Sequence, residues 1–422
     1  MAAFEGQRRL GFVALALLGV AALSEGWLRS HRPPAPGLRA GAQLVVTSAN
    51  DTGPGSLREA IFAADSADVR TLITLRTKRV VLKSPLPPLA NPRGIVLDGR
   101  GAHTEIDASA VAEGPVLELR SPDSSIQGLA VRGAAGAAVL VRASRIRLQG
   151  LSFTNCAEGV TLVEGVADVV LEDSQFEANA TGVTLPEARL VTLQRNRFTR
   201  HDHAAIWAVS PREGPAGGPA GLIVRDNQFA DDRISIVLIN VAGRLERNDF
   251  RRARESAVYL MGAGAVVRDN RSREGASMGI FADESEGALI EGNEVDHNAG
   301  VGLMLRSSGG AVVQRNRVYS NGYGIAVVFG QKARPNRMSE NLLFGQAQDG
   351  FYIVGGSPLV RGNRAVQNRE AAIRILDFAP WSGQLVPAAP LVEDNVFSGN
   401  SFDAAVRGVY RQPPPKRETE LQ

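Results

Sequence analysis

The feature that most constrains this chain is a repeat in residues 288–328, where one unit occurs almost twice. An apolar stretch runs into Asn293 and Val295, a small loop with Asn298 follows, and a Gly then opens a run of alternating apolar residues. The same order begins again at Asn316. Self-similarity at a fixed period of roughly 20–25 residues is typical of solenoids, in which each unit stacks on the next. The repeat therefore predicts a solenoid.

The coils align on one position that carries Asn in nine consecutive coils. Its spacing is 21–25 residues apart from one interval of 31 and one of 32, and its members are Leu129, Leu151, Ser174, Asn196, Asn227, Asn248, Asn270, Asn293, Asn316, Asn341, Asn363 and Asn395. Asn tolerates the left-handed backbone conformation, and stacked Asn side chains can hydrogen-bond along the axis. We expect a structural ladder here and not a binding site.

The segments between these positions read as short, mostly alternating strands, three per coil. Gly or Ala opens the strand after each loop, as in GVTL, GIAV, GFYI and AAIRI. A left-handed β-helix would show a hexapeptide period, and leucine-rich repeats would show a fixed Leu pattern that is missing here. The sequence predicts an all-β fold, a right-handed parallel β-helix of about 12 or more coils with a short N-terminal capping helix.

The capping helix is predicted in SLREAIFAADSA. Ser56 and Glu59 have the spacing of a capping box, and Leu57, Ile61 and Phe62 are apolar on one side. A helix at the open end of a β-solenoid would cover the first coil, whose free edge is otherwise a template for aggregation.

The N-terminus reads as an export signal because Arg8 and Arg9 precede the apolar run Leu10–Leu23. This run is short for a membrane span, which needs about 20 residues. We expect a secreted or periplasmic protein, with anchoring to the inner membrane through residues 10–23 as the alternative. The predicted division is 1–24 signal peptide or N-terminal anchor, 25–42 Pro-rich linker, 43–110 N-terminal cap and first coils, 111–410 parallel β-helix repeats, and 411–422 disordered tail.

Charge limits the classes of ligand that the chain can bind, and cysteine content limits its disulfides. A formal net charge of +3 argues against nucleic acid as a ligand. Of 47 Lys plus Arg, four are Lys, which leaves 43 Arg. Arg binds carboxylate and phosphate oxygens bidentately, although codon bias in a GC-rich genome explains the excess as well. Cys156 is the single cysteine, so no disulfide forms within the chain.

The repeats resemble those of pectate lyases, polygalacturonases, alginate epimerases and periplasmic NosD-type proteins. The segment VTSANDTGPGSLREAI, residues 46–61, resembles the start of secreted bacterial β-helix proteins and polymorphic outer-membrane proteins. The resemblance covers residues 43–408, and the matching residues are structural ones. No stretch matches a pectinase or epimerase catalytic signature. The resemblance implies a carbohydrate-related class and an exported location.

Candidate site residues gather where the repeat is broken. A second recurring Asn, five residues after the first, occurs at Asn179, Asn298, Asn321, Asn368 and Asn400, but the middle coils carry His201, Asp232, Ala253 and Gly275 there. Coils about 4.8 Å apart would bring their charged neighbours into one patch. We expect catalytic roles for five residues, with an ordinary solvated loop edge as the alternative: His201, His203, Asp232, Arg254 and Tyr259.

A second line of evidence is the strand after that loop, where alternation points a column of residues outward: Thr184, Trp207, Val237, Tyr259, Phe281, Met304, Tyr352 and Arg374. Aromatic rings in such a column suit the apolar faces of sugars, unless local shifts turn them inward or loops cover them. We expect substrate binding by Trp207, Phe281, Arg233, Tyr352 and Arg374, in a groove between the loops 211–221 and 378–390.

The segment with the broken repeat also contains side chains that can bind metal ions. His201, Asp202 and His203 with Asp231 or Asp232 offer ligands for zinc or copper. Asp202, however, would point away from the two His on a strand, so no metal ligand is predicted. A calcium ion that bridges an acidic glycan to Asp231, Asp232 or Asp283 is a further option, and the cofactor stays open.

Two functions fit the pattern. The first is binding or processing of an acidic polysaccharide by β-elimination or C5 epimerisation, in which Arg233 or Arg254 neutralises the uronate, His201 or His203 is the base, and Tyr259 donates a proton. A hydrolase would need paired carboxylates such as Asp202 with Asp231 or Asp232. The second is a non-catalytic surface or periplasmic scaffold or adhesion protein, or a NosD-like periplasmic metal-related protein. The expected partner is a polysaccharide, not nucleic acid.

Overall fold

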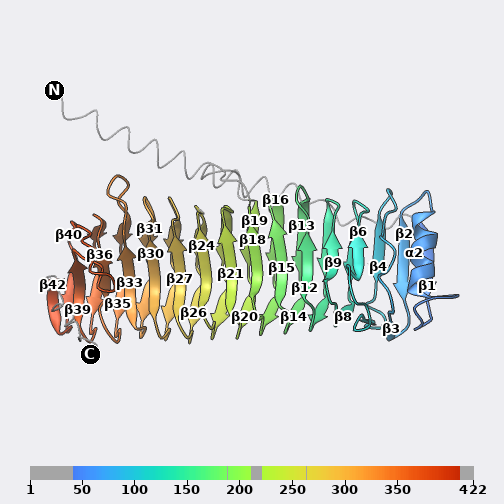
Figure 1. The fold of residues 1–422 in the computed structure, drawn as a ribbon, viewed down its shortest axis with the longest axis horizontal. Coiled ribbons are helices and arrows are strands. Elements are labelled where there is room, and N and C mark those ends of the chain that lie inside the picture. The colour runs from blue at the N-terminus through green and yellow to red at the C-terminus, as the bar shows by residue number, and fades with distance from the viewer. Residues whose placement is uncertain (1–40, 188, 211–220, 263, 409–422) are drawn as a thin grey trace, which may run out of the picture. The chain divides into compact units, whose positions relative to one another are not determined.

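The computed structural model describes residues 41–187, 189–210, 221–262 and 264–408, which form a parallel β-helix with three sheets running along its axis (Figure 1). From β4 onward every coil adds one strand to each sheet, in parallel register with the coil before it. The prediction of a parallel β-helix with three strands per coil is confirmed.

The three sheets have 15, 14 and 13 strands. Sheet A contains β1 (Ala42–Val46), β2 (Thr71–Leu75), β4 (Ile95–Asp98), β7 (Ser125–Gln127), β10 (Ile146–Gln149), β13 (Ala167–Glu172), β16 (Arg189–Gln194), β19 (Leu222–Arg225), β22 (Gly243–Glu246), β25 (Val266–Arg268), β28 (Leu289–Glu291), β31 (Val312–Gln314), β34 (Arg337–Ser339), β37 (Leu359–Arg361) and β40 (Leu391–Glu393). Sheet B contains β3 (Arg79–Val81), β5 (Glu105–Asp107), β8 (Ala130–Arg132), β11 (Ser152–Thr154), β14 (Gln175–Glu177), β17 (Arg197–Thr199), β20 (Gln228–Ala230), β23 (Asp249–Arg251), β26 (Arg271–Arg273), β29 (Glu294–Asp296), β32 (Arg317–Tyr319), β35 (Leu342–Phe344), β38 (Arg364–Val366) and β41 (Val396–Ser398). Sheet C contains β6 (Leu117–Leu119), β9 (Ala137–Val141), β12 (Glu158–Leu162), β15 (Thr181–Pro186), β18 (Ala204–Val209), β21 (Ile234–Ile239), β24 (Ser256–Met261), β27 (Met278–Asp283), β30 (Val301–Arg306), β33 (Tyr323–Val328), β36 (Phe351–Val354), β39 (Ala371–Leu376) and β42 (Phe402–Gly408).

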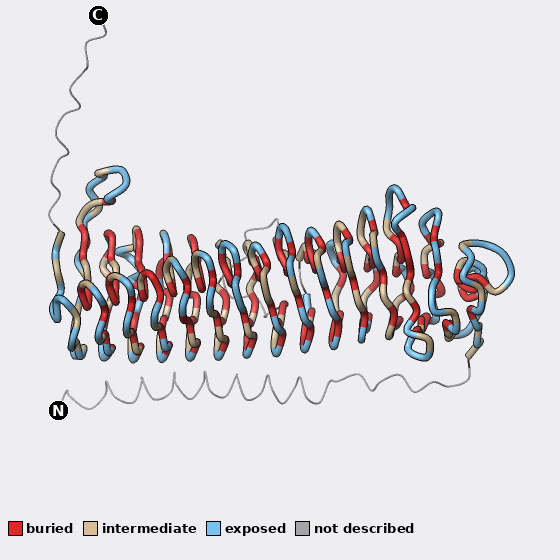
Figure 2. The backbone as a smooth tube through the Cα atoms, turned by 90° about the horizontal axis from the view of Figure 1, so that it is seen from below, coloured by how far each residue is buried: buried red, intermediate tan, exposed pale blue. Residues whose placement is uncertain are grey.

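The core is a continuous column of apolar side chains inside the coils, and buried residues recur in coil after coil along the backbone (Figure 2). Strand residues alternate inward and outward, so that in β18 the side chains of Ile206 and Ala208 are buried while Trp207 between them is half-buried. On sheet B, five inward Phe rings stack along the axis with centroid separations of 4.7–4.9 Å: Phe153, Phe176, Phe198, Phe229 and Phe250. Each Phe ring therefore packs on the Phe rings of the adjacent coils.

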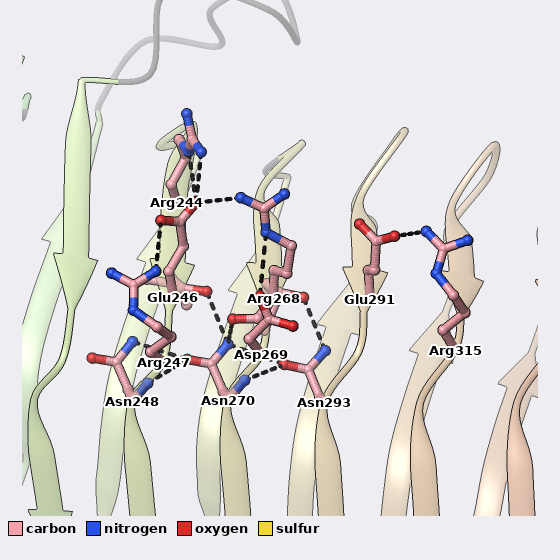
Figure 3. Close-up of polar contacts among 12 residues, drawn as sticks. Arg244, Glu246, Arg247, Asn248, Arg268, Asp269, Asn270, Glu291, Asn293 and Arg315 are labelled. Carbon is pink, nitrogen blue, oxygen red and sulfur yellow. Dashed lines mark hydrogen bonds and ion pairs between the residues drawn. The ribbon is translucent and has the colours of Figure 1, made fainter. Parts of the chain in front are cut away.

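The first Asn ladder, at the turn between sheets A and B, is structural as predicted (Figure 3). Asn270 Oδ1 accepts hydrogen bonds from the backbone N and from Nδ2 of Asn248, both at 2.9 Å, and Asn270 Nδ2 donates to Asn293 Oδ1 at 3.0 Å. The backbone detail differs from the prediction, because positive φ angles occur at the residue before each Asn, such as Asp269 at 56°. The Asn side chain satisfies the turn, and its neighbour adopts the left-handed conformation.

The second ladder, at the turn between sheets B and C, includes the positions that depart from Asn. The backbone N of Cys156 donates to Asn179 Oδ1 at 2.9 Å, and the backbone N of Asn298 donates to Asn321 Oδ1 at 2.9 Å. At the end of the solenoid, Asp403 takes the place of the next ladder residue, because its Oδ1 accepts from the backbone N of Asn400 at 2.8 Å.

Helix α2 (Leu57–Asp65) covers the first coil, as predicted. The Ser56 hydroxyl accepts from the backbone N of Glu59, and the Glu59 carboxylate accepts from the backbone N of Gly55, one residue earlier than in an ideal capping box. Leu57 and Ile61 are fully buried, whereas Phe62, expected on the same apolar side, is 59% exposed.

The predicted signal peptide or anchor, most of the linker and the tail at 411–422 lie outside the described residues. No helix in the described part of the chain is both long enough and apolar enough to span a membrane.

Candidate functional site

The outward column predicted on the strands of sheet C exists as a register. Trp207 pairs with Thr184 on one side and Val237 on the other, Tyr259 and Phe281 follow, and the column continues to Arg374. Ala326, which is absent from the predicted column, lies between Met304 and Tyr352 in the register. Since parallel strands lie about 4.8 Å apart, the column forms one platform along the axis.

Exposure varies along this platform. Trp207, Tyr259 and Tyr352 are half-buried, but Val237 is only 1% exposed and Phe281 only 7% exposed. The Phe281 ring is covered by the guanidinium of Arg306, whose Cζ lies 5.0 Å from the ring centroid, and by Tyr259, with a centroid separation of 5.2 Å. Phe281 therefore supports its neighbours more than it offers a free face.

The N-terminal part of the platform brings together four of the predicted residues. The His203 ring is exposed and packs against Trp207, with ring centroids 4.4 Å apart. Arg233 Nε donates to the Glu255 carboxylate at 2.6 Å. Arg254 Nη2 donates to the backbone O of His201 at 2.7 Å and lies 3.4 Å from the exposed carboxylate of Asp202. Arg254 is the cation in this part with the weakest carboxylate contact.

A polar centre surrounds Tyr259 in the next coils. The Tyr259 hydroxyl donates to Asp283 Oδ2 at 3.4 Å, and Asp283 Oδ1 accepts from Arg306 Nε at 2.8 Å. Burial, with the negative charge of Asp283 beside it, raises the pKa of the Tyr259 phenol. Arg306 is absent from the predicted site residues, although the sequence contains a signal for it. Arg306 ends a strand whose alternate residues point outward, and it is in register with Asp283.

A second polar centre joins Tyr352 and Arg374. The Tyr352 ring lies 4.9 Å from that of Tyr323, and burial raises the pKa of Tyr352 to about 12. Arg374 donates to Asp349 at 2.7 Å and to Glu370 at 2.5 Å. The two carboxylates hold the guanidinium in place and reduce its charge toward a ligand.

Residues 377–390 pack onto the outer face of sheet C beside this second centre. Val328, Val354 and Leu376, at the outward ends of three neighbouring strands, form a separate apolar cluster with Ala379, which Met304, Tyr352, Phe378 and Val386 contact. The predicted position of the 378–390 loop beside the platform agrees with this packing. Most of the other expected loop, 211–220, lies outside the described residues.

His201 and Asp232 do not face the platform. Both side chains have 0% exposure and occupy the second Asn ladder, where Asp232 Oδ1 accepts from the backbone N of His201 at 3.1 Å and from its Nδ1 at 2.7 Å. The carboxylate thus replaces the acceptor that Asn supplies in other coils. A polysaccharide cannot reach either group, so the predicted catalytic roles of these two residues are withdrawn.

Within the described ranges, no group of three or more His, Cys, Asp or Glu side chains is arranged to hold a metal ion. His201 and His203 in particular are separated, since one is inside the coil and the other is exposed.

Fold and sequence together define the class. Residues 216–369 match the family model described as "Right handed beta helix region", and the described residues fold as a parallel β-helix along the whole solenoid. No curated protein sequence matches the chain.

Three solved structures illustrate what the chain is similar to. The A-module of an Azotobacter vinelandii mannuronan C-5 epimerase is 12% identical, with a TM-score of 0.49 over 87% of this chain and 100% of that chain. The periplasmic alginate epimerase AlgG is 15% identical, with a TM-score of 0.45 over 78% of each chain. An alginate lyase from a Paenibacillus strain is 15% identical, with a TM-score of 0.40 over 71% of this chain and 95% of that chain.

Proposed function

We propose that the protein binds an acidic polysaccharide along the outer face of sheet C, between Trp207 and Arg374. The observation that carries this proposal is the register that places Trp207, Tyr259 and Tyr352 in one outward column. Half-buried aromatic rings present apolar surface to sugar faces and lose little conformational entropy on binding. A chain of sugar units fits a platform that repeats along one axis.

Arg254 supports an acidic ligand. Its side chain reaches across two coils to the backbone O of His201, beside His203 and Trp207. Because Asp202 is 85% exposed and 3.4 Å away, water screens most of its attraction for the guanidinium. A uronate carboxylate seated by Trp207 would form a stronger charge-assisted hydrogen bond with Arg254. Arg233 and Arg374 are matched by carboxylates and act as positioning groups.

Affinity gel electrophoresis with alginate and pectate tests the binding. Both polymers are tested with each variant. We expect Trp207→Ala and Arg254→Gln each to weaken the retardation by at least one polymer about tenfold, or roughly 1.4 kcal/mol. Phe62→Ala is the matched control, because Phe62 is an exposed aromatic residue on α2, away from sheet C. Equal retardation of the Trp207→Ala variant and the unaltered protein would refute the proposal.

A second candidate function, β-elimination or C5 epimerisation of a uronate, is favoured by the centre at Tyr259. In elimination the C5 proton leaves to a base, the C4–O4 bond breaks, and O4 takes up a proton. A phenol is protonated at neutral pH, so the Tyr259 hydroxyl is the proton donor to O4. Asp283, hydrogen-bonded to that hydroxyl and paired with Arg306, is the candidate base. His203 lies two coils from Tyr259, which places it with the binding residues.

Two assays separate these functions. Absorbance from unsaturated uronate products reports elimination, and proton exchange at C5 in deuterated water reports epimerisation. If the protein is catalytic, Tyr259→Phe abolishes the signal while retardation by the polymer persists. If neither signal appears with alginate, pectate or related uronates and retardation depends on Trp207, the non-catalytic reading stands.

We propose further that residues 1–24 direct export to the periplasm or beyond. The support is the sequence pattern of Arg8 and Arg9 before the apolar run Leu10–Leu23. Fractionation of cells and N-terminal sequencing of the mature protein test this proposal and distinguish a cleaved signal from a retained anchor.

A further inference from the structure

A second group of aromatic, cationic and acidic side chains lies on the outer face of sheet B, on different residues from those of the sheet C platform. Register places Arg273, Asp296, Tyr319 and Phe344 in one outward column, and Arg271 stands beside Glu294 in the neighbouring column. The Tyr319 ring stacks on Phe344 with centroids 4.8 Å apart and planes 10° apart. Both rings are half-buried and form an apolar edge to the polar cluster.

The polar part of this cluster holds groups that lack hydrogen-bond partners. Four buried side-chain nitrogen or oxygen atoms in the described part of the chain have none, and three of them are here: Arg271 Nε, Arg273 Nε and Asp296 Oδ2. Buried polar groups are nearly always satisfied, so such a concentration requires an explanation. Asp296 Oδ2 and Arg271 Nε are 3.7 Å apart, too far for a direct hydrogen bond.

A hydroxyl group has the chemistry that these atoms require. Placed about 2.8 Å from both, one hydroxyl accepts from Arg271 Nε and donates to Asp296 Oδ2. Both atoms are buried, whereas the Arg271 side chain as a whole is 42% exposed, so binding of a hydroxyl group requires this side chain to move.

At the edge of the polar cluster, His297 offers a hydrogen-bond acceptor for a second hydroxyl group of the ligand. Its Nδ1 lies 2.7 Å from Asp296 Oδ1, and the side chain is 59% exposed. With Nδ1 donating to the carboxylate, Nε2 is an acceptor. The ring also meets Tyr319 edge-on at 6.0 Å. The imidazole, the carboxylate and the phenol ring therefore border one small area of the surface.

The charges of the cluster nearly cancel. Arg251 and Arg273 pair with Asp249, while Arg271 lies 3.6 Å from Glu294 and 3.7 Å from Asp296. These three guanidinium groups face three carboxylates, and the exposed Arg317, in register with Glu294, adds one further positive charge. The net attraction for an anionic ligand is therefore small.

From these contacts we infer a second saccharide site on sheet B, centred on Tyr319, that takes a neutral sugar unit. The hydroxyls of the sugar bind Arg271, Asp296 and His297, and its apolar C–H surface packs beside Tyr319 and Phe344. Glu294 is a positioning residue, since its carboxylate accepts the Tyr319 hydroxyl at 2.5 Å. The site is independent of the sheet C platform and shares no residue with it.

Titration calorimetry on the full chain tests this inference with neutral oligosaccharides of glucose, mannose and xylose, and in a separate arm with oligouronates. We expect at least one neutral oligosaccharide to bind. Tyr319→Ala weakens that binding about tenfold, and Trp207→Ala leaves it unchanged. Oligouronate binding follows the reverse pattern, so failure of one site is visible apart from failure of the other.

Two conservative variants keep the test valid where Tyr319→Ala unfolds a coil. Tyr319→Phe preserves the stack on Phe344 and removes the hydroxyl by which Glu294 positions the ring, and His297→Ala removes an exposed ring whose loss leaves the core intact. Both are expected to weaken neutral-sugar binding, with circular dichroism unchanged. Binding of no neutral oligosaccharide, or binding that Tyr319→Phe and His297→Ala leave intact, overturns the inference.

Discussion

The two Asn ladders occupy equivalent turns and yet differ in sequence. The first carries Asn in every coil from Asn196 to Asn395, whereas the second changes to His201, Asp232, Ala253 and Gly275 in the middle coils. Where the second ladder has Asp232, the hydrogen bond to the backbone N of the preceding coil is kept. Where it has Ala253 or Gly275, the residue brings no side-chain acceptor.

The difference teaches that Asn itself is not needed, because other side-chain acceptors keep the hydrogen bond and the coils of Ala253 and Gly275 stack without one. Gln346 makes the same point, because its Oε1 accepts from the backbone N of Asn321 at 2.9 Å. Ionisable residues in a repeat are therefore not sufficient evidence for a site. The sheet C platform is identified instead by what its side chains present outward.

The largest effect is expected in the unbroken ladder. Asn270→Leu removes the acceptor of Asn248 and two donors, and leaves buried backbone groups of Asn248 and Leu245 unsatisfied. The free energy of unfolding should fall by about 3 kcal/mol. Urea denaturation measures this. Asp269→Asn, at the adjacent exposed position with φ of 56°, keeps a residue suited to that conformation and should change stability by less than about 0.5 kcal/mol.

A smaller effect separates two substitutions in the second ladder. Asp232→Asn keeps an acceptor for both nitrogens of His201 and should cost less than about 1 kcal/mol, whereas Asp232→Ala removes it and should cost about 2 kcal/mol. The measurement is again urea denaturation, with circular dichroism to check the coil content. Equal losses for both variants would show that the charge, and not the acceptor, matters at this position.

Alkaline pH distinguishes the ladders from the outer faces, because Asn side chains do not titrate. Burial raises the pKa of both Tyr319 and Tyr352 to about 12, with the neighbouring Glu294 adding to the shift at Tyr319 and Tyr323 adding to it at Tyr352. A free phenol titrates near 10, so the fold favours the protonated form. This stability is present below about pH 10 and is lost as the pH rises toward 12.

Thermal unfolding between these pH values measures the effect. We expect the midpoint to fall as the pH rises, and Tyr319→Phe together with Tyr352→Phe to flatten the decline. A decline that persists unchanged in the double variant would assign it to other groups.

The smallest effect is expected at the C-terminal end of the second ladder. Asp403→Ala removes the acceptor of the backbone N–H groups of Gly399 and Asn400. Amide hydrogen exchange of these two residues should accelerate while the global unfolding midpoint stays unchanged, because the last coil can open locally. Asp403→Asn is a partial control, since its single amide oxygen can still accept from the backbone N of Asn400 but no oxygen remains for that of Gly399.

The fold could be predicted because every coil repeats the same turn, strand and ladder positions. The column on sheet C also followed from strand alternation. The burial of His201 and Asp232 could not be read from sequence, because ionisable residues usually lie at the surface and the pairing of these two across coils depends on side-chain geometry. Arg306 was missed for a related reason, since its partner Asp283 lies 23 residues away and is brought near only by the register.

The stack of Phe rings makes coil number a unit of length for this molecule. Excision of residues 227–247 would remove one coil, bring Phe198 onto Phe250, and set Asn196 against Asn248. In the intact chain Val237 lies between Trp207 and Tyr259 in the register, so its removal would place Trp207 and Tyr259 side by side. The distance between these two residues can thus be changed in steps of one coil. The effect of each step on ligand affinity would report the repeat length of the ligand.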